Sequence, residues 1–282
     1  MHAKWNWLYL MAGALFCIQA AGSAQTNPAI PDDEAVFYAA TKQVNQFFRR
    51  FNCEESVEGE RYYEKDSLYH NPRIRSFFLN QLFDKGNSFI DENLKQQFIQ
   101  HVSAPGKAVF LDFHGGHWVA QVSTVFYWEG REASAILFLN LQEEHTGSKW
   151  VINHVCFRPF EEYFLKDPLD TIHFLHPLSH ELEFMNLYEV FHDEKGLVQN
   201  YTDRDYQPDY LTLFLFEVKT GALRFKTVMD VKFHFFQVDN WYFELSQFIR
   251  NGYNTGWLIS DLKKVNSKEK ELLLKDIYGR YE

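Results

Sequence analysis

The first half of the chain opens with apolar residues at helical spacing. Between Phe37 and Phe51 they recur every three or four positions, and the acids at 32–34 suit the N-terminal end of a helix. A second, short helix is expected after Pro72. A third has its apolar positions between Leu94 and Val102 and ends before Pro105-Gly106.

From residue 107 onward the period of the pattern changes from helical to alternating. Gly115-Gly116, Glu129-Gly130 and Thr146-Gly147 supply turns between the alternating segments. The predicted strands are Lys107–Phe113, His117–Trp128, Arg131–Leu141 and Lys149–Phe157. Helices followed by an antiparallel meander predict an α+β fold.

The second half repeats this scheme in a reduced form. Ser179 is expected to cap a helix, and a final helix is expected from Asn266, with Glu269 as its capping-box partner. Between these helices, the predicted strands are Tyr210–Val218, Ala222–Val238, Trp241–Ile249 and Trp257–Val265.

The two halves echo each other most closely in the last strand of each. The segment Gly147–Val155 aligns with Asn254–Leu262, which brings Trp150 and Trp257 to equivalent positions. An internal duplication explains this spacing. We therefore expect a signal peptide at 1–24, a first α+β unit at 25–157, a junction at 158–177, and a second unit with a C-terminal helix at 178–282. Each unit would pack its N-terminal helix or helices on a curved antiparallel four-stranded meander.

This order of elements resembles the cystatin-like cone of the nuclear-transport-factor-two-like superfamily. The helix Phe37–Phe51 and the four strands that end at Lys149–Phe157 carry the resemblance, with a weaker echo from Ser179 to Val265. The resemblance implies a pocket at the open end of each cone. Members such as ketosteroid isomerase use that pocket for acid–base chemistry, and many others only bind. The order of elements matches no catalytic residue of these enzymes to a position in this chain.

The first 24 residues have the three parts of a secretory signal. Lys4 precedes an apolar run from Trp5 to Ala21, and Gly22-Ser23-Ala24 provides a cleavage site before Gln25. The run is shorter than a membrane helix requires, so cleavage is favoured over a retained anchor. The later apolar runs are only of strand length, and no membrane span is expected in the mature chain. The protein is thus expected to be exported, to the periplasm or to the medium.

Charge narrows the range of partners. The 282 residues include 28 Lys and Arg against 38 Asp and Glu, which gives a net charge of −10. Nucleic acid is disfavoured as a partner, since phosphate contacts require clustered cations. No cofactor motif is found. The expected partner is a small ligand, a glycan or an envelope protein, and a homodimer stays open.

Cysteines and histidines supply further candidates. Cys53 and Cys156 could form one disulfide in an oxidising compartment, or both could be buried thiols. Asp112, His114 and His117 would suit a divalent metal if a glycine turn brought them together, but a polar hairpin face is the favoured interpretation. Histidines 173, 176 and 180 follow helical spacing, although Pro177 interrupts it and favours a surface position.

Aromatic residues beside predicted turns are the candidate ligand-binding residues. These are Trp118, Tyr127, Trp128, Trp241 and Tyr242, with core packing as the alternative. The tyrosine-rich segment Glu54–His70 could be a binding loop or a strand that covers the cone. The leading hypothesis is an exported, non-enzymatic binding module of the cell envelope. An acid–base enzyme of the isomerase, dehydratase or hydrolase kind, with its pocket in the first unit, is the alternative. A structural or assembly protein is the third.

Overall fold

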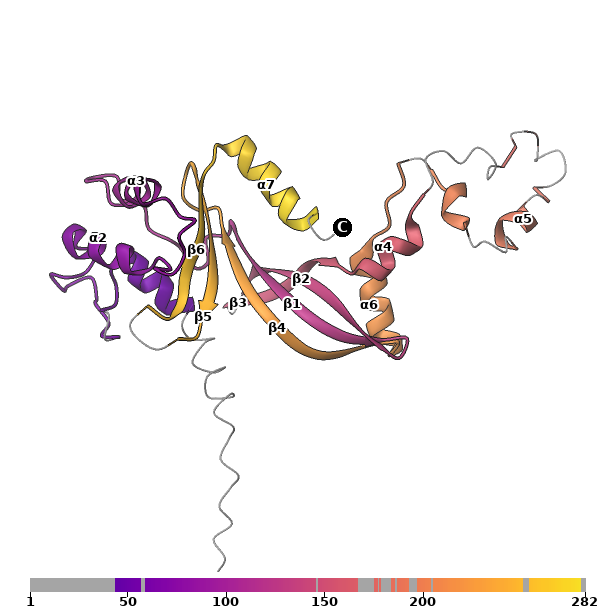
Figure 1. Ribbon diagram of the computed structural model, residues 1–282, viewed down its shortest axis with the longest axis horizontal. Coiled ribbons are helices and arrows are strands. Elements are labelled where there is room, and N and C mark those ends of the chain that lie inside the picture. The colour runs from indigo at the N-terminus through magenta and orange to yellow at the C-terminus, as the bar shows by residue number, and fades with distance from the viewer. Residues whose placement is uncertain are drawn as a thin grey trace, which may run out of the picture. The chain divides into compact units, whose positions relative to one another are not determined.

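The computed structural model describes residues 44–56, 59–145, 147–166, 175–176, 178, 184–185, 187–192, 197–203, 205–250 and 254–279 (Figure 1). The chain divides into Met1–Tyr38 and Ala39–Glu282, and every described residue belongs to the second part. The expected signal peptide and the start of the first helix lie outside the described residues. Among the helices that the structure describes, none combines the length and the apolar character that a membrane crossing requires.

In the described part of the chain, six antiparallel strands form one sheet in the order β3-β2-β1-β4-β5-β6 (Figure 1). The strands are β1 (Trp118–Trp128), β2 (Arg131–Glu144), β3 (Gly147–Cys156), β4 (Leu223–Phe235), β5 (Trp241–Phe248) and β6 (Gly256–Lys264). Each half contributes three strands, and the two sets join where β1 pairs with β4. The fold is α+β, as predicted, but two tandem four-stranded cones are not confirmed.

The segment Lys107–Phe113 was predicted as the first strand, and this prediction is wrong. Side chains from the helices form hydrogen bonds with its backbone N–H and C=O groups. Leu111 donates its N–H to Asn52 Oδ1 at 2.8 Å and accepts from Asn52 Nδ2 at 2.9 Å, and the Val109 carbonyl accepts from the Arg75 guanidinium. Because these bonds replace a strand ladder, the segment runs beside the helices rather than in the sheet.

The predicted strand Tyr210–Val218 is also wrong, because these residues belong to helix α6 (Tyr210–Thr220). Asp209 caps this helix by accepting the Thr212 N–H at 3.1 Å. Gly221 ends it with a left-handed φ of 82°, which glycine adopts without steric cost. A short apolar run fits either a buried strand or a helix, and here the two caps favour the helix.

The helices of the first half cover strands of the second half. They are the helical residues 44–52, α2 (Pro72–Gln81) and α3 (Glu92–Val102), and Figure 1 shows α2 and α3 on the side of β5 and β6. Phe98 of α3 packs edge-on against Trp241 at 5.3 Å and against Phe243 at 5.7 Å between ring centres. The largest hydrophobic core therefore joins the two halves of the sequence.

A second core lies near the opposite end of the long strands. Phe214 of α6 and Phe160 of α4 (Arg158–Phe164) pack there with Phe126, Val155 and Phe157. A helix of the second half thus covers strands of the first half. The two sets of strands depend on each other for their cores.

The C-terminal helix α7 (Ser267–Gly279) confirms the predicted capping box. The Asn266 N–H donates to Glu269 Oε2 at 2.8 Å, and the Glu269 N–H donates to Asn266 Oδ1 at 2.9 Å. Ile277 of α7 packs with Val119 and Phe138 in a third core. Because neighbouring residues of a strand point to opposite faces, this core lies on the other face of the sheet from Trp118 and Ala120.

The helix expected from Ser179 falls mostly outside the described residues. In its described part, residues 184–185 form a turn and only α5 (Leu187–Phe191) is helical, with Val190 buried and Phe191 exposed. Of the expected junction, residues 167–174 and 177 also lie outside the description, and α4 forms its first part.

Candidate binding site beside helix α7

A chain of buried polar side chains crosses the sheet face on which α7 packs. Nδ1 of His234 lies 2.9 Å from the Tyr242 hydroxyl oxygen, and Nε2 lies 3.0 Å from Gln121 Oε1. All three side chains are buried. Since Gln121 Oε1 can only accept, this arrangement fits an imidazole that donates from Nε2 and accepts the Tyr242 proton at Nδ1.

Glu244 is the acidic member of this cluster. Its Oε1 accepts from Lys232 Nζ at 3.1 Å and from the hydroxyls of Ser260 and Ser246 at 3.0 and 3.2 Å, and its Oε2 lies 4.0 Å from His234 Nδ1. Burial alone would raise its pKa. The charge and hydrogen bond of Lys232, together with His234 and Ser260, outweigh burial and lower the pKa of Glu244. The carboxylate is therefore held ionised.

Strand register brings these groups together. His234 lies opposite Glu244, and Lys232 lies opposite Ser246. Polar residues at alternate positions of β4 and β5 share one face, while the aromatic and aliphatic residues between them point into the main core. The members are Lys232, His234, Tyr242, Glu244 and Ser246. This alternation in the sequence was the signal for the cluster. Because the sequence reasoning followed residues beside turns, it found only Tyr242.

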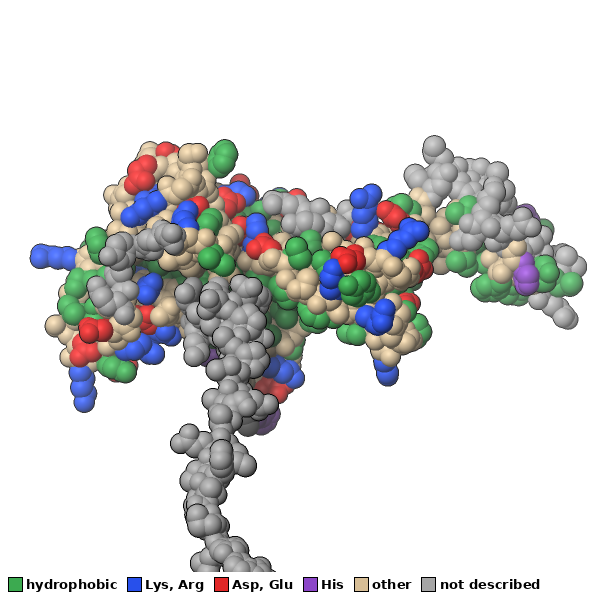
Figure 2. All heavy atoms as spheres, turned by 60° about the horizontal axis from the view of Figure 1, so that its bottom comes forward, with side chains coloured by type: hydrophobic (Ala, Val, Ile, Leu, Met, Phe, Trp, Pro, Cys, Tyr) green, Lys and Arg blue, Asp and Glu red, His purple; other side chains and the backbone are tan. Residues whose placement is uncertain are grey.

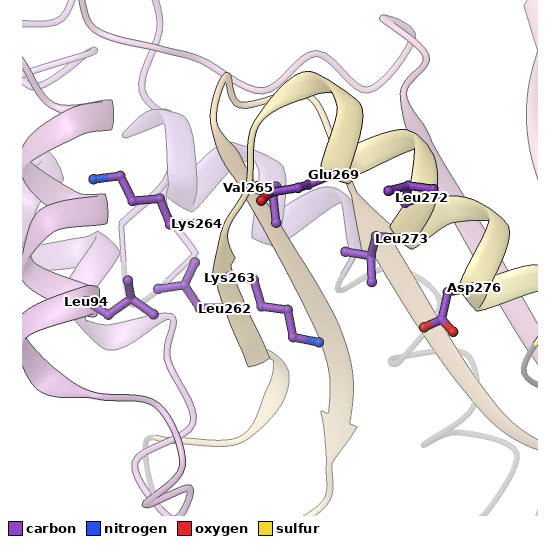
Figure 3. A pocket seen from close by; sticks show the side chains of 9 residues that line it. All are labelled: Leu94, Leu262, Lys263, Lys264, Val265, Glu269, Leu272, Leu273 and Asp276. Carbon is purple, nitrogen blue, oxygen red and sulfur yellow. The ribbon is translucent and has the colours of Figure 1, made fainter.

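The first of two grooves beside α7 opens between α3, β6 and α7 and has a volume of about 610 Å³. Figure 3 shows Leu94 from α3 and Leu262 from β6 on one side of the β6 ribbon, and Leu272 and Leu273 of α7 on its other side. Lys263 points toward the α7 side, and its Nζ lies 5.5 Å from the centre of the Tyr242 ring. The groove therefore borders the buried polar cluster.

The charged groups around this first groove already have partners. Lys263 Nζ lies 2.9 Å from Asp261 Oδ2, and Lys264 Nζ donates to Gln97 Oε1 of α3 at 3.5 Å. Figure 3 shows the two lysines pointing in opposite directions from β6. Glu269, which also lines the groove, is held in the capping box.

The second groove lies on the other side of α7 and has a volume of about 440 Å³. Trp118, Val119 and Leu141 from the sheet, Phe236 beyond β4, and Leu274 and Tyr278 from α7 form its apolar lining, with His117, Asn140, Lys270 and Glu271 as polar members. Lys270 Nζ donates to the carbonyls of Phe236 at 2.8 Å and Val238 at 2.6 Å. Burial lowers the pKa of Lys270, and the charge of Asp239 acts in the opposite direction.

Most of the aromatic candidates are core residues rather than exposed rings. Trp118, Trp241 and Tyr242 are buried, and Trp128 is partly buried against Phe157 and Phe160. Their position beside turns did not expose them, because the helices pack over those strand ends. Tyr127 is exposed, and the cations of Arg224 and Lys226 lie over its ring at 6.0 and 5.4 Å. Trp118 is still among the residues of the second groove, and the Tyr242 ring lies close to Lys263 of the first.

The candidate metal ligands do not converge. Asp112 Oδ1 accepts the backbone N–H of His114 at 2.9 Å, whereas the His114 ring contacts Ser148 Oγ at 2.9 Å. Among the described residues, no group of three His, Cys, Asp or Glu side chains could hold a metal ion. Of the three spaced histidines, 173 and 180 lie outside the description. His176 accepts the Leu178 N–H at 3.1 Å.

The two cysteines are buried and free, so the disulfide proposed for them does not form. The Cys53 thiol donates to the Leu68 carbonyl at 3.4 Å, and the Cys156 thiol donates to the Tyr278 carbonyl at 3.1 Å. The two thiols therefore lie in different parts of the fold and donate to different carbonyls. Burial raises the pKa of Cys53, which disfavours its reactive thiolate.

The tyrosine-rich segment Glu54–His70 folds back on itself through a bridge between Glu55 and Arg61. The His70 ring stacks between Tyr69 at 3.8 Å and Phe110 at 4.0 Å and contacts Glu54 Oε1 at 3.1 Å. An open hollow of about 670 Å³ lies beside it, and its lining mixes cations with the acids Glu54 and Asp112. Its balanced charge makes it a less selective site than the grooves at α7.

The sequence matches no known protein-family model, and it matches neither a curated protein nor a solved structure.

Proposed function

We propose that the protein is a non-enzymatic binding module that holds a small amphipathic ligand in the grooves beside α7. The observation that supports this best is the pair of hollows, about 610 and 440 Å³, which a single helix separates. Both volumes lie in the range of small-molecule sites, and both grooves are lined by apolar residues together with a few charged ones. A ligand with an apolar body and one polar end fits this lining.

The buried polar cluster supports binding rather than catalysis. Both ring nitrogens of His234 are engaged, one with Tyr242 and the other with Gln121. Glu244 is paired with Lys232. Groups that satisfy one another in this way stiffen the sheet face under the grooves, and they leave no side chain of the cluster poised as a free base or nucleophile.

Export to the periplasm or the medium is part of this proposal. It rests on the signal-like pattern from Lys4 to Ala24, which lies outside the described residues. The proposal also includes a duplicated origin of the two sets of strands and a distant relation to the cone superfamily. Trp150 in β3 and Trp257 in β6 occupy the outer strands of the sheet, as equivalent positions of two copies would.

The surface charge fits a small ligand better than a nucleic acid. On the face drawn in Figure 2, Lys and Arg side chains lie among Asp and Glu side chains, without a continuous basic surface on the described residues. A polyanion needs such a surface for its phosphates. The partner is therefore sought among small ligands, with a glycan or an envelope protein as the other classes.

The binding proposal is tested by methyl-labelled NMR spectra during titration with two ten-carbon amphiphiles, decanol and decanoate. Saturable shifts are expected at Leu272 and Leu274, which line the two grooves, and at Val119 beneath the second. Leu215, an exposed residue of α6, serves as the control for non-specific contact. Shifts confined to Leu215, or shifts that never saturate, would exclude the grooves as the site.

An acid–base enzyme is the second candidate, and the contact between His234 and Tyr242 favours it. With Glu244 at 4.0 Å, the three groups could pass a proton if a substrate displaced the Gln121 contact. This candidate predicts turnover on a panel of activated esters or enolisable ketones. His234→Gln would abolish the turnover, and Lys275→Met would leave it unchanged.

A further inference from the structure

The groove of about 440 Å³ between α7 and the start of β1 carries a more specific inference. We infer that it binds a single-chain amphipathic carboxylate, whose head is anchored by the Lys270 ammonium and whose chain lies between Val119, Phe236 and Leu274. This inference rests on the proposed binding function and names its ligand class and its anchor.

The position of the Lys270 ammonium supports the anchor. Two of its three protons are directed to the carbonyls of Phe236 and Val238, which fixes Nζ at one end of the groove. In the proposed complex, the third proton would be donated to the ligand carboxylate. Carbonyl oxygens orient the ammonium but do not neutralise its charge, so a ligand carboxylate would add a counter-charge to that of Asp239.

The environment of Lys270 also favours an anion. Burial lowers its pKa, because the charged form is partly removed from water. A carboxylate placed beside it would repay part of that cost. Glu271, the one acid in this lining, would oppose an anionic head, so its removal should strengthen binding.

The apolar walls define the rest of the ligand. Val119 and Phe236 come from the sheet side, and Leu274 and Tyr278 come from α7 on the opposite side. A space with apolar side chains on two sides and the Lys270 ammonium beside them suits an unbranched chain with one charged end.

The experiment is calorimetric titration of the full chain with decanoate and, as the uncharged match, with decanol, both below their aggregation concentrations. Lys270→Met should weaken decanoate binding about tenfold, as expected for the loss of one charge-assisted hydrogen bond, and should change decanol binding less than about twofold. Glu271→Gln should strengthen decanoate binding by about twofold or more.

Two control variants separate this anchor from other lysines. Lys275→Met alters an exposed lysine of the same helix that lines neither groove, and Lys263→Met alters the lysine of the first groove. Lys275→Met should leave decanoate affinity unchanged, and Lys263→Met should reduce it much less than Lys270→Met does. A tenfold loss in Lys263→Met would place the anchor in the first groove and overturn the inference.

The remaining outcomes distinguish a failure of the Lys270 anchor from a failure of the proposed binding function. If decanol and decanoate bind the natural protein equally and Lys270→Met affects neither, the anionic anchor is wrong and the binding function survives. If neither amphiphile binds the natural protein, the binding function fails as well. Should Lys270→Met fail to fold, Glu271→Gln decides, since an unchanged decanoate affinity in that variant would contradict the anchor.

Discussion

At the scale of single residues, two buried charged side chains are stabilised in different ways. Glu244 has a cation beside it, whereas Arg75 of α2 donates to the carbonyls of Phe51, Val102 and Val109. Burial lowers the pKa of Arg75 to about 10. Arg75 thereby ties three separate segments to one side chain. Its burial could not be predicted from the sequence, because an arginine among polar neighbours is normally a surface residue.

Glu244 leads to a prediction about pH. Its pKa is lower in the folded protein than its ordinary value of 4.5, so its contribution to stability is present above that value and is lost as pH falls through the folded pKa. Glu244→Gln should therefore reduce the free energy of unfolding by about 2 kcal/mol at neutral pH, because the substitution leaves Lys232 without its counter-charge.

Urea unfolding of both proteins across the acidic range measures this difference. The gap between natural protein and variant should shrink as pH falls below 4.5, with the exposed Glu143→Gln as the control for one lost charge. A gap that stays constant with pH would mean that the Lys232 pair contributes no ionic stabilisation.

At the scale of elements, α6 provides the sharpest test, because the helix and the strand interpretation predict different side-chain positions. In a strand, Phe214 and Phe216 would share a face. In the helix, Phe214 is buried with 3% exposure and Phe216 points away with 60% exposure. Phe214→Ala should therefore cost about 3 kcal/mol through the cavity that it leaves.

Phe216→Ala is the matched control and should cost about 0.5 kcal/mol or less, as is usual for exposed positions. Thermal and urea unfolding followed by circular dichroism compare the two variants. Similar losses in both would indicate that the two rings share a buried face, which would contradict the helix.

Elements whose ends are marked by capping or turn residues could be predicted from the sequence. The C-terminal helix followed from Asn266 and Glu269, and the hairpin of β1 and β2 followed from Glu129-Gly130. The two wrong strands had apolar residues in a pattern that fits more than one structure. Their true form depends on partners distant in sequence, such as Asn52 for the segment around Leu111.

At the scale of the whole molecule, the described strands of both halves form one sheet. Alternation in the sequence predicts which residues of a strand share a face, but it does not predict which strands are neighbours. The pairing of β1 with β4, and the packing of first-half helices on β5 and β6, therefore could not be derived from two similar halves. The grooves exist because α7 packs across this joint sheet.

The candidate site could be predicted only in part, for the same reason. Trp118 and Tyr242 were identified as aromatic candidates, and both are buried. Trp118 is among the residues of the second groove, and the Tyr242 ring lies 5.5 Å from Nζ of Lys263, which lines the first. Lys270 and His234 were not identified. Their roles depend on the packing of α7 and on the β4–β5 register, and neither leaves a local motif in the sequence.

The most direct test of the binding account is a crystal structure of the full chain grown with decanoate. The account predicts electron density for one extended chain between α7 and the sheet, with the carboxylate beside Lys270 Nζ and the Lys270 contacts to Phe236 and Val238 retained. Grooves filled by side chains, or decanoate bound only on the exposed residues of α6, would contradict it.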